Sequence, residues 1–272
     1  MSSNIESPTA PPQPKDAATV VLVRDGENGI EVFLQRRVQQ MAFAGGMTVF
    51  PGGGVDPRDG EADLAWQGPA ARWWAERFGA GERDARQLVC AAVRETFEEC
   101  GVLLVSAADG GAPDVAALAP ARARLEAKEI SLAQFLRDER LVLRADLLRP
   151  FAHWITPKNE KRRYDTRFFL AALPDGQRAD DRTSEVEEAG WRTAAQALDD
   201  WSAGHCFLLP PTWSQLRAVA EYGTVGALLA AERTIEPVEP ELPLGGAIDS
   251  LQFAEAAEYV ASMPPNIPRP TL

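Results

Sequence analysis

The sequence predicts an α/β fold in which a mixed β-sheet is sandwiched between helices. Apolar, β-branched runs such as residues 18–24 and 30–36 predict strands, and longer stretches with helical periodicity lie between such runs. Strands and helices interleave without a regular β-α-β rhythm, which suits a mixed sheet. The 272 residues, 45% hydrophobic and 25% charged, are typical of a globular protein with one sizeable core.

The first part of the chain predicts a leader, a hairpin and a glycine turn. Residues 1–17 are polar and Pro-rich, so we expect a disordered leader. Residues 18–24 and 30–36 flank the sequence DGENG, which predicts a β-hairpin. Another short strand is expected at 47–50, and it leads directly into the turn FPGGGVD at 50–56. Consecutive glycines let backbone atoms approach a ligand that side chains would otherwise block.

An aromatic segment separates this turn from the longest predicted helix. Residues 57–83 are charged at both ends, and residues 62–78 within them predict an amphipathic helix. We expect its tryptophans to pack on the domain rather than on a ligand. The next helix should begin with Asp84 as its N-cap and run to about Cys100, where Gly101 ends it.

The rest of the chain predicts further strands, helices and a tail. A basic turn, PKNEKRR, joins two of the strands. Strands are expected at 102–105, 147–156, 164–173 and 186–193, and helices within 115–138 (interrupted at Pro120, with Ser131 as an N-cap), at 193–203, 212–222 and 224–233. The chain from Ile235 onward is Pro-rich and expected to be extended, which places one domain at 18–235 and a C-terminal tail at 236–272.

Three carboxylates lie on one face of the central predicted helix. Glu95, Glu98 and Glu99 are spaced by one, three and four residues, so their side chains lie a few ångströms apart. Such carboxylates repel one another unless a cation neutralises them, and hard oxygen donors without His or Cys suit Mg²⁺ or Mn²⁺ rather than zinc. The opposite face is apolar and would anchor the helix in a core: Val89, Val93, Phe97 and Cys100.

The glycine turn and this helix together resemble the signature of the Nudix hydrolase family, G-x5-E-x7-R-E-U-x-E-E-x-G-U, where U is a bulky apolar residue. Gly53 matches the first glycine, and RETFEECGV at Arg94–Val102 matches the second half. Asp59 replaces the first glutamate, and Thr96 stands at an apolar position. Between Asp59 and Arg94 lie 34 residues where the signature has seven, so residues 57–83 form an insertion inside the box.

The long insertion is similar to that of one branch of the family, the coenzyme A diphosphatases. The likeness extends to KRRYDTRFFLA at 161–171 and LPPTWSQL at 209–216. The resemblance implies a Nudix α/β/α sandwich with a mixed β-sheet, a helical insertion and extra C-terminal helices. It also implies a metal-dependent pyrophosphohydrolase that cleaves a nucleoside-diphosphate-linked metabolite, with coenzyme A or an acyl-CoA as the first candidate.

Other functions stay open within and beyond this chemistry. NADH, ADP-ribose and dinucleoside polyphosphates are alternative substrates. A non-catalytic Nudix-fold module that senses a nucleotide is a different class, and it would be expected to have lost the box carboxylates, all three of which this chain retains. The Trp-rich insertion could also carry a scaffold or oligomerisation role.

The resemblance assigns roles to specific residues. A bound Mg²⁺ or Mn²⁺ would be held by one backbone carbonyl and three carboxylates: Gly53, Glu95, Glu98 and Glu99. Arg94 is expected to orient a box carboxylate rather than to touch substrate. Glu185, at the start of a predicted strand, would complete the catalytic group, with Glu187 and Glu188 as rivals. The base that activates water is left open between Glu185, Glu95 and Glu98.

Basic residues outside the box are candidates to bind substrate phosphates. One pair follows the second predicted strand, and the other group lies in and after the basic turn. Such runs are also common on solvated turns, so the alternative is an ordinary surface. The candidates are Arg36 and Arg37, and Arg162, Arg163 and Arg167.

Composition limits the partners of the protein. A net charge of −12 argues against a nucleic-acid binder or an anionic-membrane binder, which would need a basic footprint. The three cysteines have no metal-ligand spacing, and a reduced, cytoplasmic location is the default expectation. The final residues PRPTL are not a peroxisomal SKL address. We therefore expect a small-molecule, nucleoside-diphosphate-linked substrate, no nucleic acid and no membrane, and the formation of a homodimer is left open.

Overall fold

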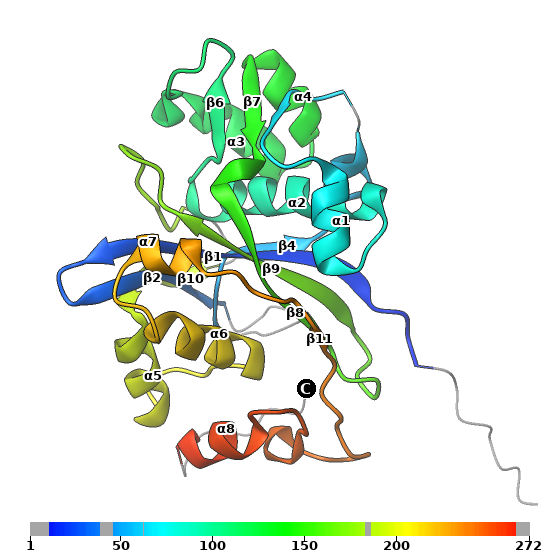
Figure 1. Ribbon diagram of the computed structural model, residues 1–272, viewed down its shortest axis with the longest axis vertical. Coiled ribbons are helices and arrows are strands. Elements are labelled where there is room, and N and C mark those ends of the chain that lie inside the picture. Colours follow the sequence, from blue (N-terminus) through cyan, green and yellow to red (C-terminus); the bar gives the residue numbers. More distant parts are fainter. Residues whose placement is uncertain (1–10, 39–45, 62, 183–185, 265–272) are drawn as a thin grey trace, which may run out of the picture.

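The structure is a computed structural model that describes residues 11–38, 46–61, 63–182 and 186–264. Within these residues a mixed sheet has the strand order β10-β2-β1-β9-β8-β11, with β3 paired to β2 and β4 paired to β1. Helices α1 and α2 lie on one side of this sheet, and α5, α6 and α8 lie on the other (Figure 1). The predicted α/β sandwich is confirmed.

The elements of the described residues have the following bounds. The strands are β1 (Lys15–Gly26), β2 (Gly29–Arg37), β3 (Thr48–Val49), β4 (Gly52–Gly54), β5 (Trp66–Gln67), β6 (Val105–Ala107), β7 (Leu141–Arg144), β8 (Leu148–Ile155), β9 (Tyr164–Ala172), β10 (Val186–Thr193) and β11 (Pro237–Val238). The helices are α1 (Ala71–Phe78), α2 (Glu82–Cys100), α3 (Ala119–Glu126), α4 (Leu132–Asp138), α5 (Ala194–Ser202), α6 (Pro210–Ala220), α7 (Val225–Ala230) and α8 (Ala256–Ser262), with a short 3-10 helix η1 (Pro57–Gly60).

The long strand β1 organises the sheet because its two halves have different antiparallel partners. Its end pairs with β2 through the predicted hairpin, where Gly26 lies opposite Gly29. Its beginning pairs with the glycines of β4, so that Ala18 lies opposite Gly53. On its other edge β1 runs parallel to β9. This forked pairing holds the glycine turn against the sheet directly beneath α2.

Two hydrophobic cores fill the two sides of the sheet. On the first side, the rings of Trp74 and Phe78 in α1 pack against Phe169 of β9, with centroids 5.4 and 5.1 Å apart. On the second side, Trp201 of α5 stacks on Tyr259 of α8 at 5.5 Å. The apolar face predicted for the central helix is buried as expected, and it anchors α2 on the first core.

Most of the predicted elements after the glycine turn are confirmed, with local differences. The N-cap of α2 is Gly81, not Asp84, which lies in its first turn. Acidic residues are favourable there because they face the positive end of the helix dipole. Gly101 ends the helix in the left-handed conformation, with φ 70°, as predicted. Residues 102–104 are buried without forming a strand, and β6 begins at Val105.

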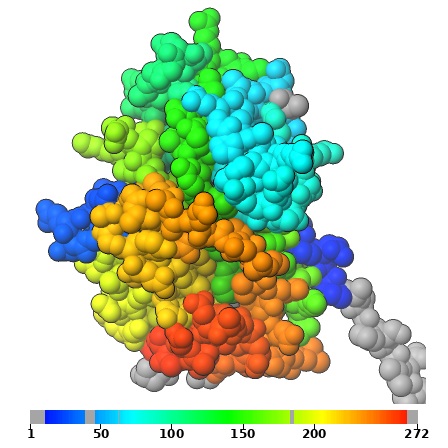
Figure 2. All heavy atoms as spheres, in the orientation of Figure 1, coloured from blue at the N-terminus to red at the C-terminus, as the bar shows by residue number. Residues whose placement is uncertain are grey.

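The insertion contributes to a small lobe above α2. Its helix α1 is shorter than predicted, but Trp74 is fully buried, which confirms that the aromatic residues pack on the domain. Strand β5 of the insertion pairs with β7 in a second sheet of order β5-β7-β6. Helices α3 and α4 complete this lobe, and Figure 2 shows it capping one end of the molecule.

The segment after Ile235 is folded, so the prediction of an extended tail is wrong for the residues that the structure describes. Strand β11 adds to the edge of the main sheet beside β8, in parallel. Tyr259 of α8 is 0% exposed, and its hydroxyl donates to the carbonyl of Leu208 at 2.8 Å. The Pro-rich composition favoured an extended chain, but large apolar side chains at 248–259 are buried in the second core and hold the segment in a folded conformation.

The two ends of the predicted domain also differ from expectation. Strand β1 begins at Lys15, so the last three residues of the predicted leader belong to the sheet. Residues 1–10 of that leader lie outside the described residues. In the part of the chain that the structure describes, none of the helices is long and apolar enough to cross a lipid bilayer.

Candidate active site

The glycine turn lies so close to α2 that side chains would not fit between them. A Cβ atom on Gly53 would lie 2.5 Å from Oε1 of Glu95, and one on Gly52 would lie 2.5 Å from the carbonyl oxygen of Ala18. The backbone N–H of Gly52 donates to Oε2 of Glu99 at 2.8 Å. The glycines therefore let β4 fit between β1 and the glutamate-bearing face of α2.

Arg94 links the glycine turn, the start of the insertion and the box glutamates. Its Nε and Nη2 donate to the two oxygens of Asp59 at 2.9 and 3.0 Å. Its Nη1 donates to Glu95 at 2.8 Å and to Glu98 at 3.0 Å, and its Nη2 also donates to the carbonyl of Gly54 at 2.9 Å. Asp59 therefore reaches Arg94 despite the insertion, and the interrupted box is continuous in space.

A capping arrangement around η1 holds Asp59 in place. Asp56 is the N-cap of η1, and its backbone N–H donates to Asp59 at 2.8 Å. Asp56 also accepts from Arg58, and this hydrogen bond lowers the pKa of Asp56 to about 2. Asp59 is 3% exposed. Its shorter side chain thus satisfies both the cap and Arg94, which explains how Asp replaces the glutamate of the family signature.

Acidic groups outnumber basic groups in this cluster. It contains the carboxylates of Asp59, Glu95, Glu98 and Glu99, the guanidinium of Arg94, and that of Arg37, which lies 4.0 Å from Glu99. Burial raises the pKa of Glu98 to about 7, although the charge of Arg94 opposes this rise. Excess negative charge in a poorly solvated place is the condition under which a cation binds.

The chemistry of this donor set fits a hard divalent cation. Carboxylate oxygens are the ligands that Mg²⁺ and Mn²⁺ prefer, and no His or Cys side chain belongs to the cluster. Among the described residues, no three Asp, Glu, His or Cys side chains converge as a preformed metal cage. Here Glu95 and Glu98 bond to Arg94, and Glu99 bonds to Gly52.

Arg122 of α3 is a residue of this region that the sequence did not reveal. Its Nε and Nη2 donate to the backbone carbonyl of Glu98 at 3.2 and 3.0 Å, and its Nη1 donates to both oxygens of Asp180 at 2.9 and 2.8 Å. A cation at the C-terminal end of a helix satisfies unpaired carbonyls and interacts favourably with the helix dipole. Arg122 thereby fixes the turn of α2 that carries Glu98.

The arginines proposed for phosphate binding lie in different surroundings. Arg37 is near Glu99, whereas Arg36 lies 3.7 Å from the exposed Glu187. Arg163 and Arg167 are buried, only 7% and 6% exposed. Their partners are carboxylates of other elements: Glu239 for Arg163, and Asp16 and Asp165 for Arg167. Arg162 is exposed on the basic turn. Their binding of substrate stays a prediction.

Glu185 is the further carboxylate expected at the start of β10. Glu185 lies outside the described residues, so its role stays a prediction. Its rivals Glu187 and Glu188 point to surface partners, Arg36 at 3.7 Å and Arg192 at 3.4 Å.

Comparison with known proteins identifies the family. A family model described as the NUDT19 Nudix domain matches residues 83–219, half of the chain. The chain belongs to the Nudix hydrolase family. The matched region begins at the last residue of the insertion and includes Arg94, Glu95, Glu98 and Glu99. The predicted family and its coenzyme A diphosphatase branch are confirmed.

Individual relatives agree with this assignment. The chain is 25% identical over 79% of its length to the acyl-coenzyme A diphosphatase NUDT19 of Xenopus laevis, and it spans 66% of that relative. It is 27% identical over 89% of its length to the protein of the same name from Homo sapiens, of which it spans 72%. These names support the expectation of a Nudix hydrolase that acts on diphosphate linkages.

A solved structure extends the likeness to the fold. The crystal structure of a NUDIX hydrolase from Alicyclobacillus acidocaldarius matches with a TM-score of 0.71 and 30% identity. The match covers 82% of this chain and 98% of the other. The predicted Nudix sandwich is thereby confirmed.

Proposed function

We propose that this Nudix hydrolase is a divalent-metal-dependent diphosphatase that cleaves coenzyme A or an acyl-CoA. The observation that carries the proposal is the cluster beside the glycine turn, in which Asp59, Glu95 and Glu98 bond to Arg94 and Glu99 bonds to Gly52. The retained carboxylates favour catalysis over a purely sensing role. The choice of substrate class is supported by the names of the relatives from Xenopus laevis and Homo sapiens.

The reaction is hydrolysis of a phosphoanhydride. A water oxygen forms a bond to one phosphorus, the bond from that phosphorus to the bridging oxygen breaks, and the leaving phosphate keeps the electron pair. The water loses its proton to a base, and the products are two phosphorylated fragments. From coenzyme A these would be adenosine 3′,5′-bisphosphate and a phosphopantetheine.

The residues of the cluster would divide this work. When bound, Mg²⁺ or Mn²⁺ supplies Lewis-acid stabilisation of phosphate charge and lowers the pKa of water. Gly53, Glu95, Glu98 and Glu99 are the proposed residues that hold it. Arg94 positions Glu95 and Glu98 through the bonds from its Nη1. The proton acceptor is Glu98, Glu95 or Glu185, and a bound cation would lower the pKa of any of these carboxylates that holds it.

A hydrolysis screen tests this proposal. The protein is incubated with coenzyme A, acetyl-CoA, NADH, ADP-ribose and diadenosine polyphosphates, with and without Mg²⁺ or Mn²⁺, in ¹⁸O-labelled water. We expect metal-dependent release of adenosine 3′,5′-bisphosphate from the CoA compounds, and mass spectrometry then shows which product carries ¹⁸O. Cleavage of another compound alone would replace the substrate assignment. Absence of cleavage across the panel would overturn the catalytic proposal.

We also propose that the protein is cytoplasmic and forms a homodimer. Light scattering of the purified protein would measure its mass in solution. A mass of one chain, about 29.6 kDa, would exclude the dimer.

A further inference from the structure

Lys128 has a left-handed backbone conformation at the end of α3, with φ 56°. The chain turns there through two backbone hydrogen bonds, from the N–H of Lys128 to Leu125 at 2.8 Å and from that of Glu129 to Arg124 at 2.9 Å. Glycine is the usual residue at such a position because it has no Cβ to clash. A lysine at this position therefore has a backbone conformation that costs some free energy.

Arg58 fixes the position of this lysine relative to the glycine turn. Its Nη1 donates to the carbonyl oxygen of Lys128 at 3.0 Å, while its Nη2 bonds to Asp56 at 2.9 Å. Asp56 caps the same short helix that contains Asp59. The turn after α3 is thus tied to the residues that position Arg94.

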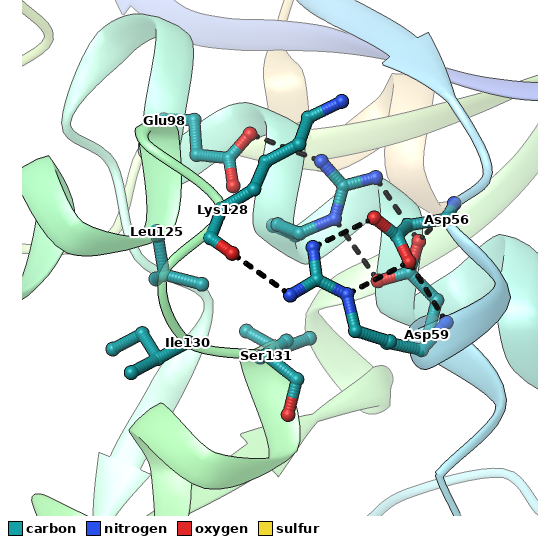
Figure 3. A pocket seen from close by; sticks show the side chains of 10 residues that line it. Asp56, Asp59, Glu98, Leu125, Lys128, Ile130 and Ser131 are labelled. Carbon is teal, nitrogen blue, oxygen red and sulfur yellow. Dashed lines mark hydrogen bonds and ion pairs between the residues drawn. The ribbon is translucent and has the colours of Figure 1, made fainter.

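Lys128 and Glu98 line one small pocket, together with Asp59 and Arg94. Figure 3 shows the side chain of Lys128 extending from its turn over the pocket into which Glu98 projects. The neighbouring guanidinium groups of Arg58 and Arg94 are paired with carboxylates. Within the part of the chain that the structure describes, the ammonium of Lys128 has no carboxylate at ion-pair distance.

We propose that Lys128 contacts the diphosphate of the substrate and binds its anionic oxygens, an inference that rests on the proposed function. The cluster beneath it has more acidic than basic groups, so an anionic substrate needs additional positive charge at this place. An ammonium on a flexible stem suits phosphate as a point charge that can follow the group during cleavage. The pairing of the other two cations leaves Lys128 available for this role.

Arg140 provides a matched control within the same lobe. It also has φ 56°, it also follows a short helix, α4, and its carbonyl accepts from Ala108 at 2.9 Å. Arg140 does not line the pocket that Lys128 shares with Glu98. If only the left-handed backbone mattered, substitution of Lys128 and of Arg140 by glycine would change ligand binding in the same way. If Lys128 contacts the substrate, only its substitution would weaken binding.

Binding of a non-hydrolysable diphosphate tests the proposal independently of turnover. Isothermal titration calorimetry measures the Kd of α,β-methylene-ADP with Mg²⁺ for the full chain and for Lys128→Gly, Lys128→Arg and Arg140→Gly. We expect Lys128→Gly to weaken binding about tenfold, which is about 1.4 kcal/mol. Lys128→Arg should stay within threefold of the unmodified chain, and Arg140→Gly should leave Kd unchanged. The loss should shrink at high salt because the interaction is between charges.

Thermal unfolding separates this role from a structural one. Both glycine variants should keep or raise Tm, because glycine relieves the left-handed backbone. Equal Kd values for Lys128→Gly and the unmodified chain would overturn the proposal. If Lys128→Gly lowers Tm, the binding measurement is made with Lys128→Gln instead, because glutamine keeps a long side chain without the charge. An unchanged Kd for Lys128→Gln would then overturn the proposal. If the hydrolysis screen fails while Kd depends on Lys128, the diphosphatase function falls and the phosphate contact stands.

Discussion

Two buried arginines among carboxylates, Arg94 and Arg167, differ in the charge balance around them. Arg94 touches Asp59, Glu95 and Glu98, and Glu99 lies on the same helix face. Arg167 pairs with Asp165 at 2.6 Å and Asp16 at 3.1 Å, and His153 lies 2.5 Å from the same oxygen of Asp165. We name these groups the Arg94 cluster (Asp59, Arg94, Glu95, Glu98, Glu99) and the Arg167 cluster (Asp16, His153, Asp165, Arg167).

The two clusters differ in how far their cations compensate their carboxylates. In the Arg167 cluster, two carboxylates face one guanidinium, and the ring of His153 also contacts Asp165, so carboxylates exceed cations by only one. The Arg94 cluster has an excess of carboxylates and adjoins a glycine turn that leaves its backbone open. Buried ion pairs alone do not indicate a functional site. The excess of carboxylates in the Arg94 cluster, next to the backbone of the glycine turn, is a better indication of a functional site.

Neutralising one carboxylate in each cluster should give the largest contrast. Glu98→Gln should lower kcat by about 10²- to 10⁴-fold, because an amide neither accepts the proton nor neutralises a cation. Asp165→Asn, the matched change in the Arg167 cluster, should keep kcat within about twofold. Steady-state kinetics on the substrate found in the screen measures both. Near-normal kcat for Glu98→Gln, with its fold intact by circular dichroism, would remove Glu98 from the catalytic group.

The free energy of unfolding should show the next largest difference. Asp59→Asn leaves the buried guanidinium of Arg94 without its bidentate partner and should cost about 3 kcal/mol. Asp16→Asn, whose side chain is 48% exposed and whose arginine keeps Asp165, should cost less than about 1 kcal/mol. Urea denaturation measures both. Equal losses would show that Asp59 is no more structural than an ordinary surface partner.

One carboxylate in each cluster, Glu98 and Asp165, should make stability depend on pH with opposite sign. Burial raises the pKa of Glu98 to about 7 from 4.5, so the folded, metal-free protein binds a proton more tightly than the unfolded chain. Its free energy of unfolding should therefore fall by up to about 3 kcal/mol between pH 5 and pH 8. Glu98→Gln should remove this dependence. If the free energy of unfolding of Glu98→Gln still fell between pH 5 and pH 8, another group would be responsible for the pH dependence.

Asp165 supplies the opposite case. Burial works against its ionisation, but hydrogen bonds and charges from His153 and Arg167 hold its pKa below the ordinary value. Its stabilising contribution is therefore complete above the ordinary pKa of an aspartate and is lost as the pH falls below it. Acid unfolding of Asp165→Asn should consequently show a shallower pH dependence than that of the unmodified chain. The prediction would be contradicted if the stability of Asp165→Asn and that of the unmodified chain fell with the same slope at acid pH.

The smallest expected effect concerns substrate affinity. Arg37, which lies near Glu99, is the predicted phosphate ligand that belongs to the surroundings of the Arg94 cluster. Arg37→Gln should raise KM about fivefold, or about 1 kcal/mol. Arg167→Gln should act mainly on Tm, because Arg167 is buried between two aspartates. A larger rise in KM for Arg167→Gln would move the phosphate site to the Arg167 cluster.

The sequence predicted the parts of the site that depend on local spacing. The common face of Glu95, Glu98 and Glu99 follows from helix geometry, and the need for glycine at Gly53 follows from its lack of a side chain. Local spacing did not predict the roles of Arg122 and Lys128. They belong to the lobe of residues 105–144, and their approach to α2 depends on how that lobe packs, which no short-range pattern encodes.

The same distinction explains the fold. Helix and strand positions after the box were predicted because periodicity is local, as for β10, whose bounds agree with the prediction. The segment after Ile235 was mistaken because its prolines favour extended chain, while its burial depends on Trp201 and Trp213 far away in the sequence. Long-range burial of Tyr259 decided the outcome against local composition.

The position of β11 has a consequence for biosynthesis. A ribosome makes residues 237–263 after every other strand of the main sheet, so β8 has an unpaired edge until they emerge. The cavity that Tyr259 later fills is open during the same interval. An exposed strand edge and an incomplete apolar surface are the features through which nascent chains associate wrongly. Residues 237–263 therefore protect the β8 edge and the second core, and a chain whose translation stalls before Pro237 is expected to be prone to aggregation.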